Sequence, residues 1–270
     1  MPLLLEAYEK YKVKATFFFT ADISQMFPEI VKMILPFGHE VACHGLTHEK
    51  DKAFDVLSLD EQIDHLRKSK DILETISGRE VISFRAPALR VNKYTPQALS
   101  QTGFLIDSSV APQRIDIFLS FGSKKKLKWL LAPRKPYFTT PTDLSREGKG
   151  RIFEIPISSF LLSYSGTTMR ISPFLARVTR SVLNIESIIF NHPLMFLLHP
   201  NELINEEVDI IQVSRRSKNY IAYLLRDKLR YQLKLRNLGK KALPLLADQL
   251  EYLTSKNYSF ITCREYYNFL

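Results

Sequence analysis

The sequence predicts an α/β protein in which strands and helices alternate around a parallel sheet or barrel. Short runs rich in β-branched and aromatic residues, such as 13–19 and 81–84, alternate with longer segments of helical periodicity. Helix start and stop signals separate these segments, and polar side chains follow several of the apolar runs. Because the carboxyl ends of parallel strands meet at one rim, we expect the ligand site there.

The first 110 residues supply most of these elements. In order along the chain we expect a helix over 2–11, a strand over 13–19, a helix over 25–36, strands over 39–42 and 81–84, a helix over 95–103 and a strand over 104–106. Ser58 and Glu61 have the spacing of a capping box, and Gly78 is a residue type that favours the end of a helix. A long helix is therefore expected between them.

The alternation of strand and helix signals is interrupted between residues 108 and 151, and this region is too long for an ordinary loop. We expect a single domain over 1–270, with a rim insertion at about 108–151 and a basic helical segment at about 213–250. Beyond the insertion, the expected elements are a strand over 152–157, a helix over 172–183, an apolar run over 194–198 and a short strand over 258–262 before a terminal helix.

Composition narrows the class of protein. The chain has 270 residues, of which 45% are hydrophobic, enough for one sizeable core. No apolar run approaches the ~20 residues that span a bilayer, and no secretory leader follows Met1, so we expect a soluble, cytoplasmic chain. The two cysteines, Cys43 and Cys263, are too few for a disulfide framework, which favours a reduced interior.

The net charge of +10 is concentrated in one segment. Between residues 213 and 241 lie ten Lys or Arg residues and one acid, Asp227, and a smaller lysine cluster occupies 124–128. Two interpretations stay open: a solvated surface, or contact with an anionic membrane or another polyanion through 215–241. No aromatic interleaving accompanies the charge, so no nucleic acid is expected as a partner.

His44 and His48 form the most informative motif. Two imidazoles four residues apart after an apolar run can reach one zinc-sized cation, whether the backbone is helical or a tight loop. A catalytic zinc usually takes three protein ligands, so a third donor, most plausibly a carboxylate, must come from elsewhere.

Several motifs together resemble the polysaccharide deacetylase family, the NodB-like carbohydrate esterases. Their order and spacing match that family from residue 1 to about 110, and the match returns near His199. The motifs are Ala15-Thr16-Phe17-Phe18-Phe19, Gly38-His39-Glu40-Val41-Ala42-Cys43-His44-Gly45-Leu46-Thr47-His48, Phe84-Arg85-Ala86-Pro87, Gly103-Phe104 with Asp107-Ser108-Ser109, and Leu197-Leu198-His199-Pro200.

The resemblance implies a distorted barrel of about seven βα units and metal-dependent removal of N-acetyl groups from an N-acetylated glycan. It implies that His44 and His48 bind a divalent metal, usually zinc, and that His199 is the general acid. Arg85 would orient the catalytic carboxylate. The residue after Pro87, here Ala88, would offer its backbone N–H to the oxyanion.

One departure from the family pattern matters. The family's first strand ends in Thr-Phe-Asp-Asp-Gly, which supplies the catalytic base and the third metal ligand, and no Asp-Asp pair occurs in this sequence. A barrel without that strand would expose unpaired edges, which favours a truncated start over true loss. The alternatives are thus an N-terminally truncated enzyme and a catalytically inactive glycan-binding relic.

Other residues carry competing interpretations. Arg85 could form a structural ion pair with Asp107, a role compatible with catalysis. Thr47 could brace the histidine loop by a side-chain hydrogen bond. Asp22 and Asp107 are the nearby carboxylates that could replace the third ligand, an exchange we do not favour. Three further histidines are assigned structural roles: His39, His65 and His192.

Overall fold

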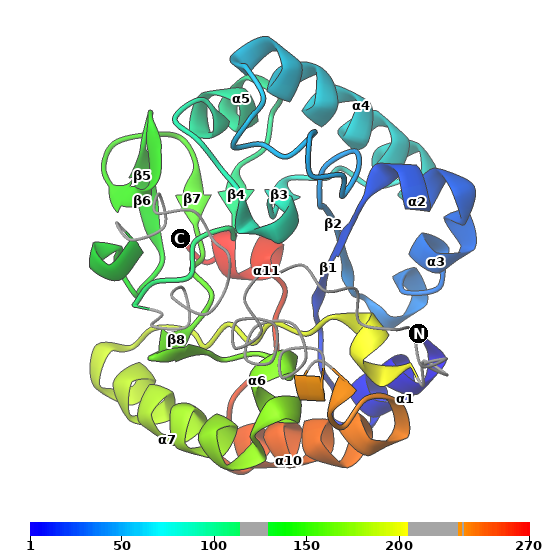
Figure 1. Ribbon diagram of the computed structural model, residues 1–270, viewed down its shortest axis with the longest axis vertical. Coiled ribbons are helices and arrows are strands. Elements are labelled where there is room, and N and C mark those ends of the chain that lie inside the picture. Colours follow the sequence, from blue (N-terminus) through cyan, green and yellow to red (C-terminus); the bar gives the residue numbers. More distant parts are fainter. Residues whose placement is uncertain (114–128, 205–231, 234) are drawn as a thin grey trace, which may run out of the picture.

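A seven-stranded sheet lies at the centre of the computed structural model, and helices surround it (Figure 1). The structure describes residues 1–113, 129–204, 232–233 and 235–270. The strand order is β1-β2-β3-β4-β7-β5-β6. The parallel strands are β1 (Thr16–Phe19), β2 (Glu40–Cys43), β3 (Ser83–Phe84), β4 (Ile106–Asp107) and β7 (Phe153–Glu154). The antiparallel strands are β5 (Tyr137–Thr140) and β6 (Asp143–Glu147).

Chain order equals strand order from β1 to β4, as expected for consecutive βα units. The register is fixed by pairs such as Phe19 with Cys43 and Cys43 with Phe84. The parallel strands β2, β3, β4 and β7 are short and all of their residues are buried, which explains why they show no alternation of buried and exposed positions. The register also brings the residues that follow β2, β3 and β4 to the same end of the sheet.

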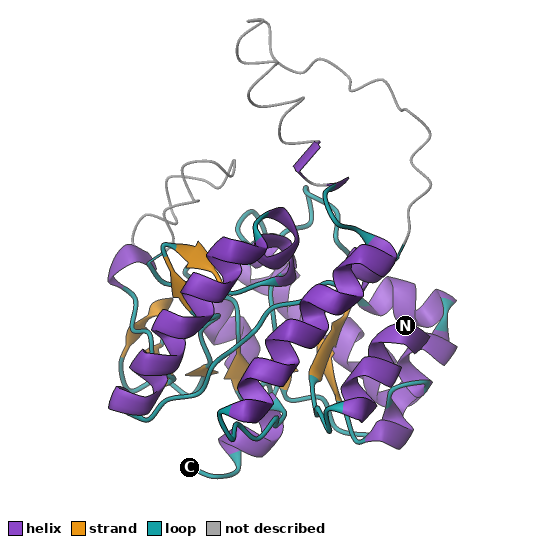
Figure 2. Ribbon diagram, turned by 90° about the horizontal axis from the view of Figure 1, so that it is seen from below, coloured by secondary structure: helices purple, strands orange, loops and turns teal. Residues whose placement is uncertain are grey.

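Helices cover the outside of the sheet (Figures 1 and 2). Those before β4 are α1 (Pro2–Lys10), α2 (Ala21–Met26), α3 (Pro28–Lys32), α4 (Leu59–Ser77) and α5 (Thr95–Gln101). Those after β7 are α6 (Gly166–Ile171), α7 (Pro173–Phe190), α10 (Ala242–Ser255) and α11 (Cys263–Tyr267). Two-residue strands β8 (Ser159–Phe160) and β9 (Leu162–Ser163) form a separate hairpin.

Helix α4 follows the sequence prediction closely. The Ser58 side chain accepts the Glu61 backbone N–H, and the Glu61 carboxylate accepts the Ser58 N–H at 2.7 Å. The helix ends at Gly78, whose φ of 64° lies in the left-handed region. Leu66 and Leu73 are fully buried on its inner face, where the apolar spacing predicted them.

Several predicted elements differ in the structure. The helix expected over 25–36 is divided into α2, α3 and the 3-10 helix η1 (Leu35–Phe37), because Pro28 and Pro36 lack the N–H that a continuous helix requires. The run 194–198 forms one isolated bridge, between Leu197 and Ser165, and 258–262 forms no strand. Within 108–151, strands β5 and β6 extend the sheet.

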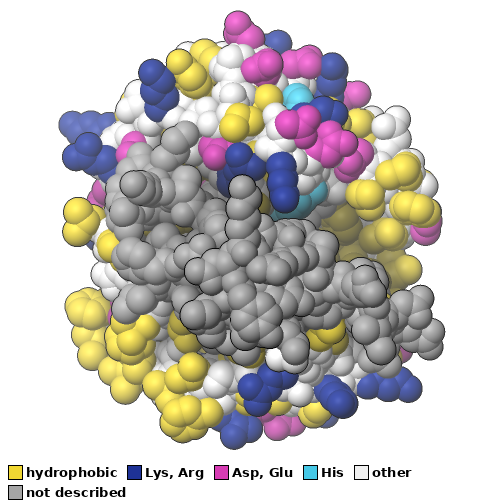
Figure 3. All heavy atoms as spheres, in the orientation of Figure 1, with side chains coloured by type: hydrophobic (Ala, Val, Ile, Leu, Met, Phe, Trp, Pro, Cys, Tyr) yellow, Lys and Arg dark blue, Asp and Glu magenta, His cyan; other side chains and the backbone are white. Residues whose placement is uncertain are grey.

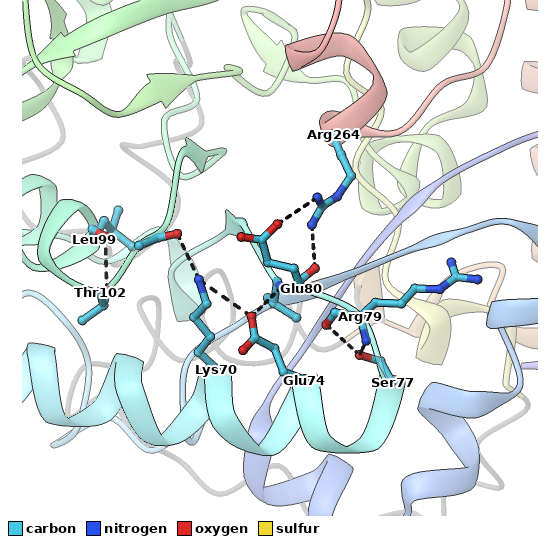
Figure 4. A network of polar contacts seen from close by, with 10 residues as sticks. Lys70, Glu74, Ser77, Arg79, Glu80, Leu99, Thr102 and Arg264 are labelled. Carbon is cyan, nitrogen blue, oxygen red and sulfur yellow. Dashed lines mark hydrogen bonds and ion pairs between the residues drawn. The ribbon is translucent and has the colours of Figure 1, made fainter.

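The amino ends of the strands are closed by α11 and a polar network, of which Figure 4 shows the contacts between Arg264 and Glu80. Glu40, at the start of β2, accepts hydrogen bonds from Ser83 at 2.6 Å, Thr16 at 2.7 Å and the Arg264 backbone N–H at 3.0 Å. The Arg264 side chain donates to the Glu80 carbonyl at 2.5 Å. These bonds fix α11 beneath the sheet, at the end opposite the residues that follow β2 and β3.

Two predictions lie largely outside the described residues. The lysine cluster 124–128 lies outside the described residues. The basic segment 213–250 is described only at 232–233 and from 235 onward. Within the described part of the chain, no helix combines the length and apolar character needed to cross a membrane.

We predict that Ser58→Ala lowers the free energy of unfolding by about 1 kcal/mol, because the backbone N–H of Glu61 loses its acceptor and the Glu61 carboxylate loses the Ser58 hydroxyl as a donor. Urea denaturation measures this loss. Ser181→Ala, at an exposed mid-helix position of α7, is the control and should not destabilise the protein. Equal losses in both variants would contradict the capping role.

Candidate active site

The His44–His48 segment is a loop that directly follows β2. The two imidazole ring centroids lie 5.5 Å apart with the ring planes at 46°. Gly45 between them has φ of +79°, and a Cβ there would lie 3.1 Å from Phe54 Cε2 and 3.3 Å from Pro87 Cγ. The loop can therefore turn both rings to one side only because position 45 has no side chain.

A hydrogen bond sets the orientation of the His44 ring. Its Nδ1 lies 2.6 Å from the carbonyl oxygen of Arg85, so the Nδ1–H donates to that oxygen. Burial lowers the pKa of His44 to about 3, and the nearby Arg85 charge acts in the same direction. The ring is therefore neutral, and the lone pair of Nε2 is left for another partner.

His199 lies at the same rim, after the run that bridges to Ser165. Burial of the ring lowers the pKa of His199, the Glu202 charge acts in the opposite direction, and the charges of Arg85 and His48 lower the pKa further. The charge of His199 in turn lowers the pKa of His44. His44 contacts Arg85 directly and lies beside His48, and His199 interacts with these residues through its charge. Figure 3, which views this end of the molecule, shows histidine side chains among acidic and basic ones.

Arg85 is buried and held from both sides. Its Nε donates to the Ser108 carbonyl at 2.8 Å and its Nη2 to the Ser108 hydroxyl at 2.7 Å, while the guanidinium lies 4.2 Å from the centre of the Phe18 ring. Of the two roles left open for Arg85, the described residues show no direct ion pair with Asp107, and the side-chain hydrogen bonds of Arg85 go to Ser108. Asp107 still influences Arg85 through its charge.

Asp107 forms a buried carboxyl pair with Glu154. The two residues are register partners on β4 and β7, and neither is exposed to solvent. Asp107 accepts both the hydroxyl of Ser109 at 2.7 Å and its backbone N–H at 3.1 Å, whereas Oε2 of Glu154 is buried without a hydrogen-bond donor. Burial raises the pKa of both carboxyls, most at Glu154, where the Asp107 charge adds to the effect. Burial and the Asp107 charge thus both favour the uncharged form of Glu154.

The Ser109 hydroxyl connects this pair to the loop after β3, because it accepts the Ala86 backbone N–H at 2.8 Å. Beyond Ala86, the 3-10 helix η2 (Pro87–Leu89) contains two non-glycine residues in the left-handed region, Ala88 at φ 52° and Leu89 at φ 54°. Such backbone persists only where its surroundings hold it, and it is concentrated at functional sites.

The remaining candidates have modest roles in the structure. The Thr47 hydroxyl accepts the Glu49 N–H at 3.4 Å, a weak contact within the histidine loop. His39 lies at the opposite end of β2 and accepts the Ala15 N–H at 3.2 Å. His65 lies on α4, and the ring of His192 lies 3.5 Å from Glu186. These three positions are away from the His44–His48 loop.

Sequence reasoning missed three residues that support this site. Glu154 interrupts the apolar run 152–157, and an acidic residue inside a predicted buried strand was an available signal. Glu202 and Arg170 form a buried ion pair at 3.3 Å next to His199, and their partnership across 32 residues leaves no local pattern.

The donor set partly fits a zinc ion. His44 offers a neutral Nε2 whose partner nitrogen is bound to a carbonyl, the usual arrangement of a metal-binding imidazole, and His48 lies beside it. Within the described residues, no group of three or more His, Cys, Asp or Glu side chains has the geometry to hold a metal ion. Asp107 has its carboxylate directed to Ser109, and Asp22 accepts the adjacent Ile23 N–H.

Comparisons with known proteins find similarity in the first part of the chain. Residues 1–106 match the family model for polysaccharide deacetylase. The chain is 32% identical over 110 residues to the peptidoglycan deacetylase of Helicobacter pylori, which covers 41% of this chain and 36% of the relative. It is 35% identical over 100 residues to a peptidoglycan deacetylase-like protein of Gibberella zeae. This match covers 36% of this chain and 28% of that relative. The chain thus matches about a third of the length of each relative.

The fold is shared beyond the matched region. A probable polysaccharide deacetylase from Pseudomonas aeruginosa PAO1 superposes with a TM-score of 0.55, over 97% of this chain and 69% of that one, at 16% identity. This likeness shows the fold, and it confirms the distorted barrel expected from the sequence.

We predict that Gly45→Ala destabilises the protein more than Gly78→Ala does. Both glycines have positive φ, so both variants lose about 1–2 kcal/mol from the left-handed backbone, but a Cβ at position 78 meets nothing within 4 Å. The difference in unfolding free energy, measured in urea, reports the crowding against Phe54 and Pro87. Equal losses would contradict the close approach.

We predict that Glu154→Gln reduces the pH dependence of stability. The pKa of Glu154 is higher in the folded chain than in the unfolded chain. When the pH lies between these two pKa values, the folded chain binds a proton at Glu154 that the unfolded chain has released. Stability contributed by this group is therefore complete at low pH and falls as pH rises, by about 1.4 kcal/mol per pH unit within that window. Glutamine does not titrate and keeps the size of the side chain. Unfolding free energies from pH 5 to 8 should decline less in the variant, and parallel curves would contradict the raised pKa of Glu154.

Proposed function

We propose that the chain is a metal-dependent hydrolase that removes N-acetyl groups from a carbohydrate, because residues 1–106 match the polysaccharide deacetylase family model. The observation that supports this most is the neutral His44 ring, bound through Nδ1 to the Arg85 carbonyl and presented beside His48 at the rim that also carries His199.

In this proposal His44 and His48 hold a divalent metal ion, with zinc the expected metal. Such an ion polarises a carbonyl and lowers the pKa of water, which makes hydrolysis of an unreactive amide feasible. The hydrogen bond from Nδ1 of His44 to the Arg85 carbonyl keeps the proton on Nδ1, so that the lone pair of Nε2 is available to the metal ion. A backbone carbonyl thus takes the place that a carboxylate often has behind a metal-binding histidine.

His199 supplies the proton that the departing amine needs. An amine is a poor leaving group unless its nitrogen is protonated, and an imidazole can donate a proton near neutral pH. Partial burial and the Arg85 charge lower the pKa of His199, so the neighbouring Glu202 carboxylate is needed to keep its protonated form accessible.

Two features of the β3 loop support the remaining roles. The left-handed backbone at Ala88 holds the peptide after Pro87 in one conformation, suited to presenting its N–H to the oxyanion. Arg85, fixed by Ser108 and Phe18, provides a buried positive charge that can orient a catalytic carboxylate.

The proposed substrate class is an N-acetylated glycan. Two relatives are named for action on peptidoglycan, which makes an N-acetylated glycan of that kind the first substrate to test. Contact with an anionic membrane through 215–241 concerns residues that lie mainly outside the described part of the chain, and no contact of the described residues bears on it.

The test is acetate release from an N-acetylglucosamine oligomer by the whole gene product, with bound zinc measured after dialysis. We expect His44→Ala to lose zinc and activity together, and His199→Ala to retain zinc while activity falls by about 100-fold or more. His65→Ala, on α4, is the control and should change neither.

Three outcomes separate the possibilities. Acetate release that is unaffected by His44→Ala would contradict the proposed metal site. Retained activity in His199→Ala would contradict its role as the acid. Oligomer binding without acetate release would instead favour a glycan-binding relic.

A further inference from the structure

A buried ion pair lies directly behind His199. Arg170 of α6 and Glu202 of the 3-10 helix η5 (Pro200–Leu203) approach to 3.3 Å, and each side chain is only 4% exposed. Oε1 of Glu202 also accepts the Thr167 hydroxyl at 2.6 Å. Its other oxygen, Oε2, accepts the backbone N–H of His199 at 3.4 Å. One carboxylate therefore joins α6 to the residue proposed as the general acid.

The chain leaves space for this carboxylate at Gly166. A Cβ at that position would lie 1.9 Å from Oε2 of Glu202 and 2.5 Å from Cδ1 of Leu198. The Gly166 backbone N–H donates to the Leu197 carbonyl at 2.8 Å. The start of α6 thus packs tightly against residues 197–202, with Glu202 enclosed between them.

The remaining contacts of the pair restrain it further. Arg170 Nη1 donates to the Arg236 carbonyl at 2.8 Å, and the Asn237 side chain donates to the Arg170 carbonyl at 2.8 Å. The Glu202 backbone N–H donates to the His199 carbonyl at 2.9 Å. His199 is therefore held through both its N–H and its carbonyl by the same residue.

Stability alone is a poor explanation for such a pair. Removing two charges from water is costly, and apolar side chains of similar volume often stabilise a protein as well or better. A carboxylate differs from an apolar side chain in accepting directed hydrogen bonds and in placing negative charge beside the imidazole.

We propose that Glu202, held by Arg170 and Thr167, is a positioning residue that fixes His199 for proton donation to the leaving amine. This inference rests on the proposed function, in which His199 is the general acid. Glu202 acts through His199 and does not itself touch the substrate.

The kinetic test compares an amide with an ester. The amide substrate is the N-acetylglucosamine oligomer, whose amine must be protonated as it leaves, and the ester is 4-nitrophenyl acetate, whose leaving group needs no proton. We expect Glu202→Gln to lower kcat on the amide by about 10- to 100-fold with KM nearly unchanged. Activity on the ester should change less than about twofold. Glu202→Asp should recover part of the loss, because it restores the charge.

A second background identifies the route of the effect. In His199→Ala, adding Glu202→Gln should cause no further loss, because a residue that acts only through His199 has nothing left to position. Glu186→Gln is the matched control. It removes a second largely buried ion pair, between Glu186 and Arg134, which lies next to His192, and it should leave kcat unchanged. Equal losses on amide and ester, or additive losses with His199→Ala, would overturn the inference.

A readout without catalysis separates this inference from the proposed function. In protein labelled with ¹⁵N-histidine, Glu202→Gln should shift the ring signals of His199 and leave those of His65 and His192 in place. If the wild-type protein releases no acetate, the proposed function fails, and the spectrum alone decides whether Glu202 positions His199. An unchanged His199 spectrum would overturn the inference whatever the activity.

Discussion

The hydrogen bond between His44 Nδ1 and the Arg85 carbonyl is the interaction on which the site depends. It joins the residues that follow two adjacent strands, and the register of those strands brings the partners together: the Arg85 N–H donates to the Cys43 carbonyl at 2.9 Å, one residue before His44. The same bond fixes which ring nitrogen carries the proton. This one hydrogen bond therefore depends on the strand register and also determines which nitrogen of His44 can bind a metal ion.

Beneath this contact lies a buried polar layer. Arg85 is held by Ser108, Ser109 connects Asp107 to the Ala86 peptide, and Glu154 completes the layer. Unpaired polar groups in a buried site cost free energy. The layer is stable because its members hydrogen-bond to one another and because the raised pKa of Glu154 favours its uncharged form. The layer supports the loop after β3, where Ala88 and Leu89 have the left-handed backbone conformation that non-glycine residues rarely adopt.

Local signals in the sequence predicted much of this arrangement. The α4 caps and the rim positions of His44, Arg85 and His199 follow from capping chemistry and from the rule that parallel strands end at one rim. What could not be predicted depends on distant partners. The buried pairing of Asp107 with Glu154, and the hydrogen bonds of Arg85 to Ser108, arise from strand register and burial, which no local pattern encodes.

The measurement that tests the central claim most directly is X-ray absorption at the zinc edge on the zinc-loaded protein, compared with His44→Ala and His48→Ala. The account predicts imidazole nitrogen from two histidines in the first shell of one ion, with one imidazole lost in each variant. A spectrum without imidazole scattering, or one that neither substitution alters, would contradict the account.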